Sequence, residues 1–132
     1  MFNKKTVFAV VLGLVISAIG YANTASIIGL WHISQDFAGV RYTVQLGIEE
    51  SITHVAFSCE VGKEKAIIRV DVPSKISGNQ YSILAPINKA ESVAGRECKL
   101  ALNPASATFE VTPTHLTLRI PQGQATLTRV QQ

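Results

Sequence analysis

Helical periodicity is missing from the amino-acid sequence, and the common signatures of catalysis are missing with it. The chain has no Gly-x-Ser-x-Gly, no His-Glu-x-x-His and no glycine-rich phosphate loop. Its three histidines, His32, His54 and His115, do not stand at ligand spacing to one another. Because no nucleophile is paired with a base, we expect that the protein is not an enzyme and that it holds no metal and no cofactor.

The first 22 residues have the three parts of a secretory signal peptide. A basic head containing Lys4 and Lys5 precedes an apolar run over residues 6–19, and small residues lead up to Ala22. The run is shorter than the roughly 20 residues that a membrane span needs. We therefore expect cleavage after Ala22, no transmembrane span in the mature chain, and a periplasmic or secreted protein. Residues 23–132 then form a single domain.

The mature chain has almost no excess of positive or of negative charge. The whole sequence has 12 basic and 9 acidic residues, but Lys4 and Lys5 lie in the expected leader. The remaining charges nearly balance and form no basic stripe, which argues against a nucleic-acid partner. The oligomeric state stays open.

Cysteine is also scarce, since the chain has two, Cys59 and Cys98. An even count in an exported protein indicates a disulfide. No further Cys or His stands at ligand spacing to either one, so a metal site is the less favoured interpretation. Cys59 ends the third expected strand and Cys98 begins the sixth. An up-and-down topology places both at one rim, where a bridge is geometrically plausible.

Alternation of apolar and polar residues is what the sequence does contain. It is clearest over residues 40–48, 65–72 and 115–120. Weaker strands are expected at 27–36, 52–60, 79–85, 96–102, 107–111 and 124–130. Turn-forming residues separate these runs, among them 73–79, and residues 86–95 form a longer connection. Eight or nine short strands with short connections predict an all-β fold, a small antiparallel up-and-down barrel.

The stretch Gly29-Leu30-Trp31 resembles the start of the lipocalins, or of the wider calycin group of small ligand-holding barrels. In that group the Trp packs across the closed end of the barrel beneath an Arg from the last strand. The matching residue here is Arg129, which shares its parity with Ala125 and Leu127. The resemblance implies that Gly29, Trp31 and Arg129 have structural roles. It also implies a binding or accessory module for a small apolar ligand or an envelope partner.

The candidate ligand-binding residues follow from strand parity, which turns their side chains toward the barrel interior. They are Tyr42, Val44, Ile68, Val70 and Tyr81. An open lumen lined by such residues favours ligand binding, and a filled lumen with a protruding 73–81 loop favours a protein partner.

A second resemblance leads to a different function. The segments 57–59, 77–81 and 123–127 are similar to parts of the periplasmic inhibitors of C-type lysozyme. That family uses a Ser-Gly-x-x-Tyr loop to enter the lysozyme cleft. The resemblance implies an inhibitor of a hydrolase that acts through Ser77, Gly78 and Tyr81 of a 73–81 loop. A structural envelope protein without a ligand is the third alternative.

Overall fold

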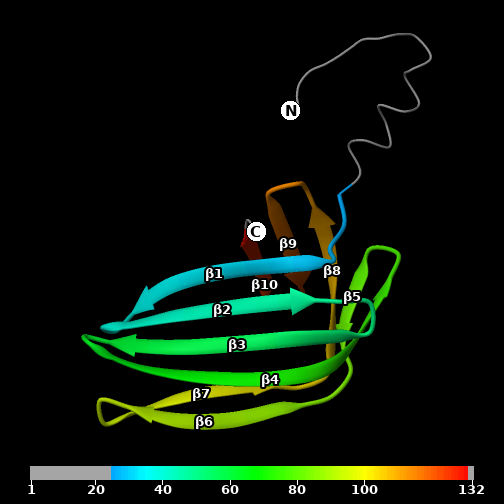
Figure 1. Ribbon diagram of the computed structural model, residues 1–132. Coiled ribbons are helices and arrows are strands. Elements are labelled where there is room, and N and C mark those ends of the chain that lie inside the picture. The colour runs from blue at the N-terminus through cyan, green and yellow to red at the C-terminus, as the bar shows by residue number, and fades with distance from the viewer. Residues whose placement is uncertain (1–24, 131–132) are drawn as a thin grey trace, which may run out of the picture.

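The computed structural model of the protein describes residues 25–130, which form ten β-strands (Figure 1). The expected leader, residues 1–22, lies outside the described residues. In chain order the strands are β1 (Gly29–Phe37), β2 (Val40–Ile48), β3 (Ile52–Val61), β4 (Glu64–Ser77), β5 (Gln80–Ile83), β6 (Ile87–Val93), β7 (Arg96–Leu102), β8 (Ala105–Val111), β9 (His115–Ile120) and β10 (Gly123–Arg129).

Eight of these strands form a closed barrel in the order β1-β10-β9-β8-β5-β4-β3-β2. Every neighbouring pair is antiparallel, which confirms the predicted antiparallel barrel. The contact that closes the barrel is short, because β1 and β10 pair only where Trp31 faces Arg129 and His32 faces Thr128. The other residues of these two strands are not paired with each other.

The remaining two strands, β6 and β7, form a separate hairpin that is not part of the barrel wall. The chain leaves the barrel after β5 and returns to it at β8, and the hairpin lies beside β4 (Figure 1). The sequence prediction of a long connection over residues 86–95 is therefore wrong. In β6 only the end residues Ile87 and Val93 are buried, and the five between them are exposed. The strand consequently shows no apolar alternation.

Strand β4 is longer than predicted and contains Pro73, which the sequence places in a turn. The carbonyl oxygen of Pro73 accepts a hydrogen bond from the backbone N–H of Leu84 at 2.9 Å, so the strand continues despite the missing N–H of the proline. The predicted loop over 73–81 is thus two paired strands joined by a tight turn at Gly78 and Asn79.

Two apolar clusters fill the interior. The first lies between the hairpin and the inner side of β2, β3 and β4, and we call that side the covered face. Its buried members are Val40, Val55, Phe57, Cys59, Ala66, Ile68, Val72, Ile87, Val93, Cys98 and Leu100. The second surrounds Trp31 inside the closed part of the barrel. Its buried members are Ile27, Trp31, Ile48, Tyr81, Leu116 and Leu127.

Candidate ligand site

One end of the barrel is closed by Trp31. Its side chain is 0% exposed, and its indole Nε1 donates a hydrogen bond to the carbonyl oxygen of Ile27 at 2.9 Å. The ring packs within the second cluster, among residues such as Leu116 and Leu127. Because the indole N–H is satisfied by the chain segment just before β1, the bulkiest residue of the core is buried without an unpaired polar group.

Arg129 lies over this ring, with its Cζ 4.1 Å from the Trp31 centroid, as the parity of the last strand predicts. Its guanidinium donates hydrogen bonds to three carbonyl oxygens, of Pro113 at 2.9 Å, Ser26 at 2.8 Å and Ile28 at 3.4 Å. A cation placed over an indole face is attracted by the ring quadrupole. The arginine therefore joins both ends of the described chain to the β8–β9 turn.

Gly29 supplies the space that this arrangement needs. A Cβ atom built on Gly29 would lie 2.5 Å from Nη1 of Arg129, and the residue has a φ of +149°, which side-chain-bearing residues rarely adopt. The Gly-x-Trp stretch is therefore explained by the arginine. The glycine accommodates the guanidinium and the tryptophan supports it from below.

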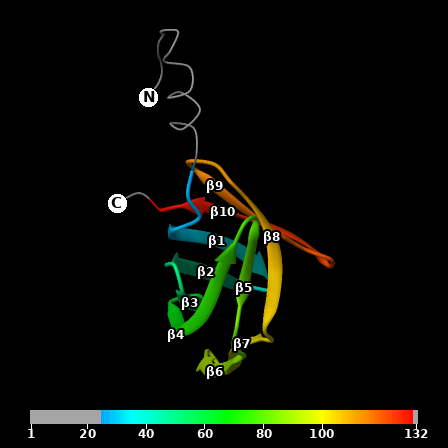
Figure 2. The same ribbon diagram turned by 90° about the vertical axis from the view of Figure 1, so that its right-hand side faces the viewer.

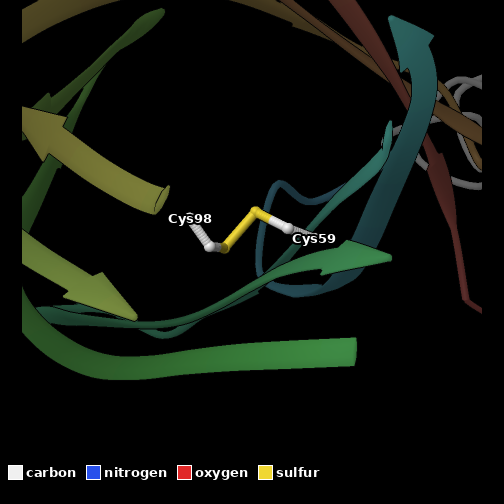
Figure 3. The surroundings of a disulfide bond; sticks show 2 residues. All are labelled: Cys59 and Cys98. Carbon is white, nitrogen blue, oxygen red and sulfur yellow. A yellow bond between two sulfur atoms is a disulfide. The ribbon is translucent and has the colours of Figure 1, made fainter. Parts of the chain in front are cut away.

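A disulfide between Cys59 and Cys98 fastens the hairpin to the covered face (Figure 3). This pairing confirms the predicted bridge, but its position is different from the predicted one. The bond does not link two barrel strands at one rim, because Cys98 belongs to the hairpin strand β7 and Cys59 to the barrel strand β3. The bond crosses the interior between the wall and the hairpin.

Hydrogen bonds hold the tip of the hairpin at the far edge of the same face. The backbone N–H of Ala94 donates to the Glu64 carboxylate at 3.1 Å, and Arg96 donates through Nη1 to the carbonyl oxygen of Ala38 at 2.8 Å. The hairpin is thus fixed to the β3–β4 turn, the β1–β2 turn and the wall between them.

The covered face holds four of the five residues that were predicted to bind a ligand. Ile68 is buried in the first cluster, and Tyr42, Val44 and Val70 pack against it. The Tyr42 ring also stacks on Phe57, with 6.0 Å between the ring centroids. The hairpin occupies the space in front of these side chains, so they belong to a filled core.

The opposite inner side, formed by β5, β8, β9 and β10, is uncovered, and we call it the open face. Figure 2 shows β5 and β8 side by side, with the hairpin of β9 and β10 next to them and the β6–β7 hairpin below. The open face lines a cavity of about 480 Å³. The lining residues are Tyr81, Ile83, Leu102, Asn103, Ala105, Ser106, Ala107, Leu118, Ile120, Gln122, Gly123, Gln124 and Ala125.

Tyr81 is the one predicted ligand-binding residue that lines this cavity, and it lies at the boundary between the cavity and the core. Its ring is buried, and its hydroxyl lies 2.6 Å from the hydroxyl oxygen of Thr53. Thr53 in turn donates to the hydroxyl oxygen of Ser74 at 2.8 Å. Burial raises the pKa of the Tyr81 phenol, while the hydrogen bond with Thr53 lowers it in part. The phenol therefore stays neutral and fixes the floor of the cavity.

The same geometry separates the three residues of the lysozyme-inhibitor hypothesis. Ser77 and Gly78 lie at the tight turn between β4 and β5, where Gly78 has a φ of +60° and is exposed. Tyr81, by contrast, points into the barrel and is bonded to Thr53. The turn therefore does not present the tyrosine to a protein partner.

A polar cluster lies on the outer face of the barrel, away from both inner faces. His54 bonds through Nδ1 to Asp71 and through Nε2 to Glu49, each at 2.7 Å. These two carboxylates raise the pKa of His54, with Asp71 as the larger cause. Within residues 25–130, no group of three or more His, Cys, Asp or Glu residues is arranged to hold a metal ion. The cluster is a set of exposed polar contacts that connect β3 with β4 and with the β2–β3 turn.

The fold and its cavity define the class of the protein as a small antiparallel β-barrel with one bare interior face. Comparison of the chain with protein-family models, with curated proteins and with solved structures gives no match. In the described part of the chain, no helix is long and apolar enough to cross a membrane.

Proposed function

We propose that the protein is an exported binding protein that holds a small apolar ligand in the cavity of the open face. One observation carries this proposal. A bare apolar surface lies inside the barrel, whereas the matching surface on the other side is covered by the chain's own hairpin. The resemblance of Gly29, Trp31 and Arg129 to the calycin pattern points in the same direction.

The size and the lining of the cavity support a small molecule as the occupant. Its volume of about 480 Å³ lies within the range of roughly 300–1,000 Å³ that is usual for ligand sites. Leu102 and Ile120 are each 46% exposed at its edge. A ligand that covered these side chains would remove apolar surface from water, and this burial would favour binding.

The disulfide supports the exported part of the proposal. A bond such as Cys59–Cys98 persists in oxidising compartments and is rare in the cytosol. Because the cavity residues include no nucleophile paired with a base, we propose binding and not catalysis as the function of the cavity.

The uncharged fluorescent dye Nile red tests the proposal, because its emission rises in an apolar site. The purified protein should bind it with saturation, and Ala125→Phe should weaken the binding because Ala125 lines the cavity. Ala101→Phe is the matched control. It introduces the same side chain at an exposed position of β7 that does not line the cavity.

Two results would contradict the proposal. The first is a dye that binds without saturation, and the second is equal weakening by Ala125→Phe and Ala101→Phe. Mass spectrometry of the natively purified protein adds an independent measurement, since a retained ligand would appear as a defined increase in mass.

A further inference from the structure

The cavity of the open face is free of charged side chains. Apart from Tyr81, none of its lining residues is ionisable. Tyr81 is itself kept neutral by burial and is already bonded to Thr53. The wall of the cavity thus provides neither a cation for a carboxylate or phosphate nor an anion for an amine.

The two arginines of the strands that form the open face are bonded to groups outside the cavity. Arg119 of β9 pairs on the outer side with the carboxylate of Glu110 at 2.9 Å and donates to Oε1 of Gln124 at 3.1 Å. Arg129 of β10 lies over Trp31 at the closed end, where its donors are bonded to backbone carbonyls. A charged ligand group inside the cavity would therefore have no counter-ion.

Neutral polar groups are present in the cavity lining. The side-chain amides of Asn103 and Gln122 come from the β7–β8 connection and from the β9–β10 turn. Each amide offers both hydrogen-bond donors and an acceptor. Such groups can bond to a hydroxyl, an ester or an amide of a ligand whose apolar part rests on Ile83, Leu118 and the alanines.

We propose that the cavity selects uncharged amphiphiles, molecules with an apolar chain or ring and a neutral polar end, and discriminates against fatty acids and alkylamines. This proposal rests on the proposed function of the same cavity and adds the chemical class of its ligand. The physical reason is desolvation, because a charge that leaves water without a partner is strongly penalised whereas a neutral polar group that finds a hydrogen bond is not.

Displacement of Nile red by three compounds with the same hydrocarbon chain tests the selection. The compounds are 1-dodecanol, dodecanoate and dodecylammonium, each used below the concentration at which it aggregates. We expect dodecanol to displace the dye at a concentration at least about tenfold lower than either charged compound. Dodecanoate should gain affinity when the pH is lowered and its carboxylate becomes neutral.

A charge placed in the cavity should reverse the preference. Ile120→Lys adds a cation at its edge, and it should make dodecanoate a better competitor than dodecanol. Ile67→Lys is the matched control because Ile67 is an isoleucine of similar exposure, 43% against 46%, and it lies outside this cavity. It should leave the order of the three compounds unchanged.

The outcomes separate the two proposals. Equal displacement by all three compounds, or the strongest displacement by dodecanoate, would overturn the selection for uncharged ligands and leave the binding function standing. Failure of the protein to bind Nile red, together with failure to bind any of the three compounds in isothermal titration, would overturn both. An unchanged order of the compounds in Ile120→Lys would contradict the electrostatic reason for the selection.

Discussion

The covered face and the open face are two inner sides of one barrel, and they differ in whether another part of the chain packs against them. Both consist of strands whose alternate side chains point inward. The covered face meets the β6–β7 hairpin and becomes solid core, whereas the open face keeps a cavity of about 480 Å³. The apolar pattern of a strand therefore sets which side faces inward, and the chain path sets whether that side is filled.

Side-chain size deepens the contrast. The covered face presents Phe57 and Ile68 to the hairpin. The open face presents Ala105, Ala107 and Ala125, which leave depth above the strands. Large residues beneath the hairpin form a surface matched to it, whereas the small residues of the open face leave the space that the proposed ligand would occupy.

Removal of the shared closed end should have the largest effect, because both faces depend on it. Trp31→Ala should lower the free energy of unfolding by about 3–5 kcal/mol, as for other large aromatic residues of a core. Arg129→Ala should cost less. Denaturant unfolding of the two single variants and the double variant measures the coupling, and the losses should not add, because the two side chains share a contact. Strict additivity would contradict the role given to the arginine.

Removal of the bridge should affect the covered face alone. Cys59→Ala with Cys98→Ala should cost about 4 kcal/mol by the chain-entropy relation, because the bridge closes a loop with a sequence separation of 39 residues. Hydrogen exchange should accelerate in β6 and β7, and Nile red binding at the open face should persist. Chemical reduction of the unsubstituted protein is the matched comparison. Slower exchange in the hairpin than in the barrel strands would contradict the covering role of the bridge.

Removal of the Tyr81 hydroxyl, at the boundary of the two faces, should have the smallest effect on stability. Tyr81→Phe removes the bond to Thr53, whose hydroxyl keeps Ser74 as a partner, and should cost about 1 kcal/mol. Burial raises the pKa of Tyr81 above its ordinary value of 10.0, so the folded state holds this proton more tightly than the unfolded state does. This contribution to stability is therefore constant below about pH 10 and falls as the pH rises above it.

Thermal unfolding, measured at a series of alkaline pH values, tests the direction of this change in stability. The unsubstituted protein should lose stability more steeply above about pH 10 than Tyr81→Phe does. Tyr42→Phe is the control, since Tyr42 lies at the covered face, away from the Thr53 and Ser74 hydroxyls. Identical slopes for the unsubstituted protein and Tyr81→Phe would contradict the assignment.

Much of the barrel could be predicted from the sequence, because period-two alternation reports directly on which side of a strand is buried. The clearest runs correspond to β2, β4 and β9, and the parity of β10 places Arg129 over Trp31. The cysteine pair follows from its even count. Strand alternation is a local pattern in the sequence, and two cysteines allow only one intramolecular pairing.

The hairpin and the cavity could not be predicted, because both depend on how distant segments meet. Strand β6 buries only its two ends and so lacks alternation. A signal for its turn is present, since Ala94-Gly95 repeats the Ala38-Gly39 pair of the β1–β2 turn, and all four residues have positive φ. Alanine is uncommon in such turns. The predicted ligand residues face inward correctly, but parity does not reveal which inner side the hairpin fills.

The pairing of β1 with β10 also sets an order of assembly. Ile28 and Arg129 are bonded across a sequence separation of 101 residues, so the wall cannot close until almost the whole described chain has been synthesised. The partners of the disulfide are much closer in sequence, and strands β1 to β4 are available early. Because contacts between distant segments form slowly, we expect the covered face to assemble first. The open face is then the last part to form, when β9 pairs with β8 and β10 pairs with β1.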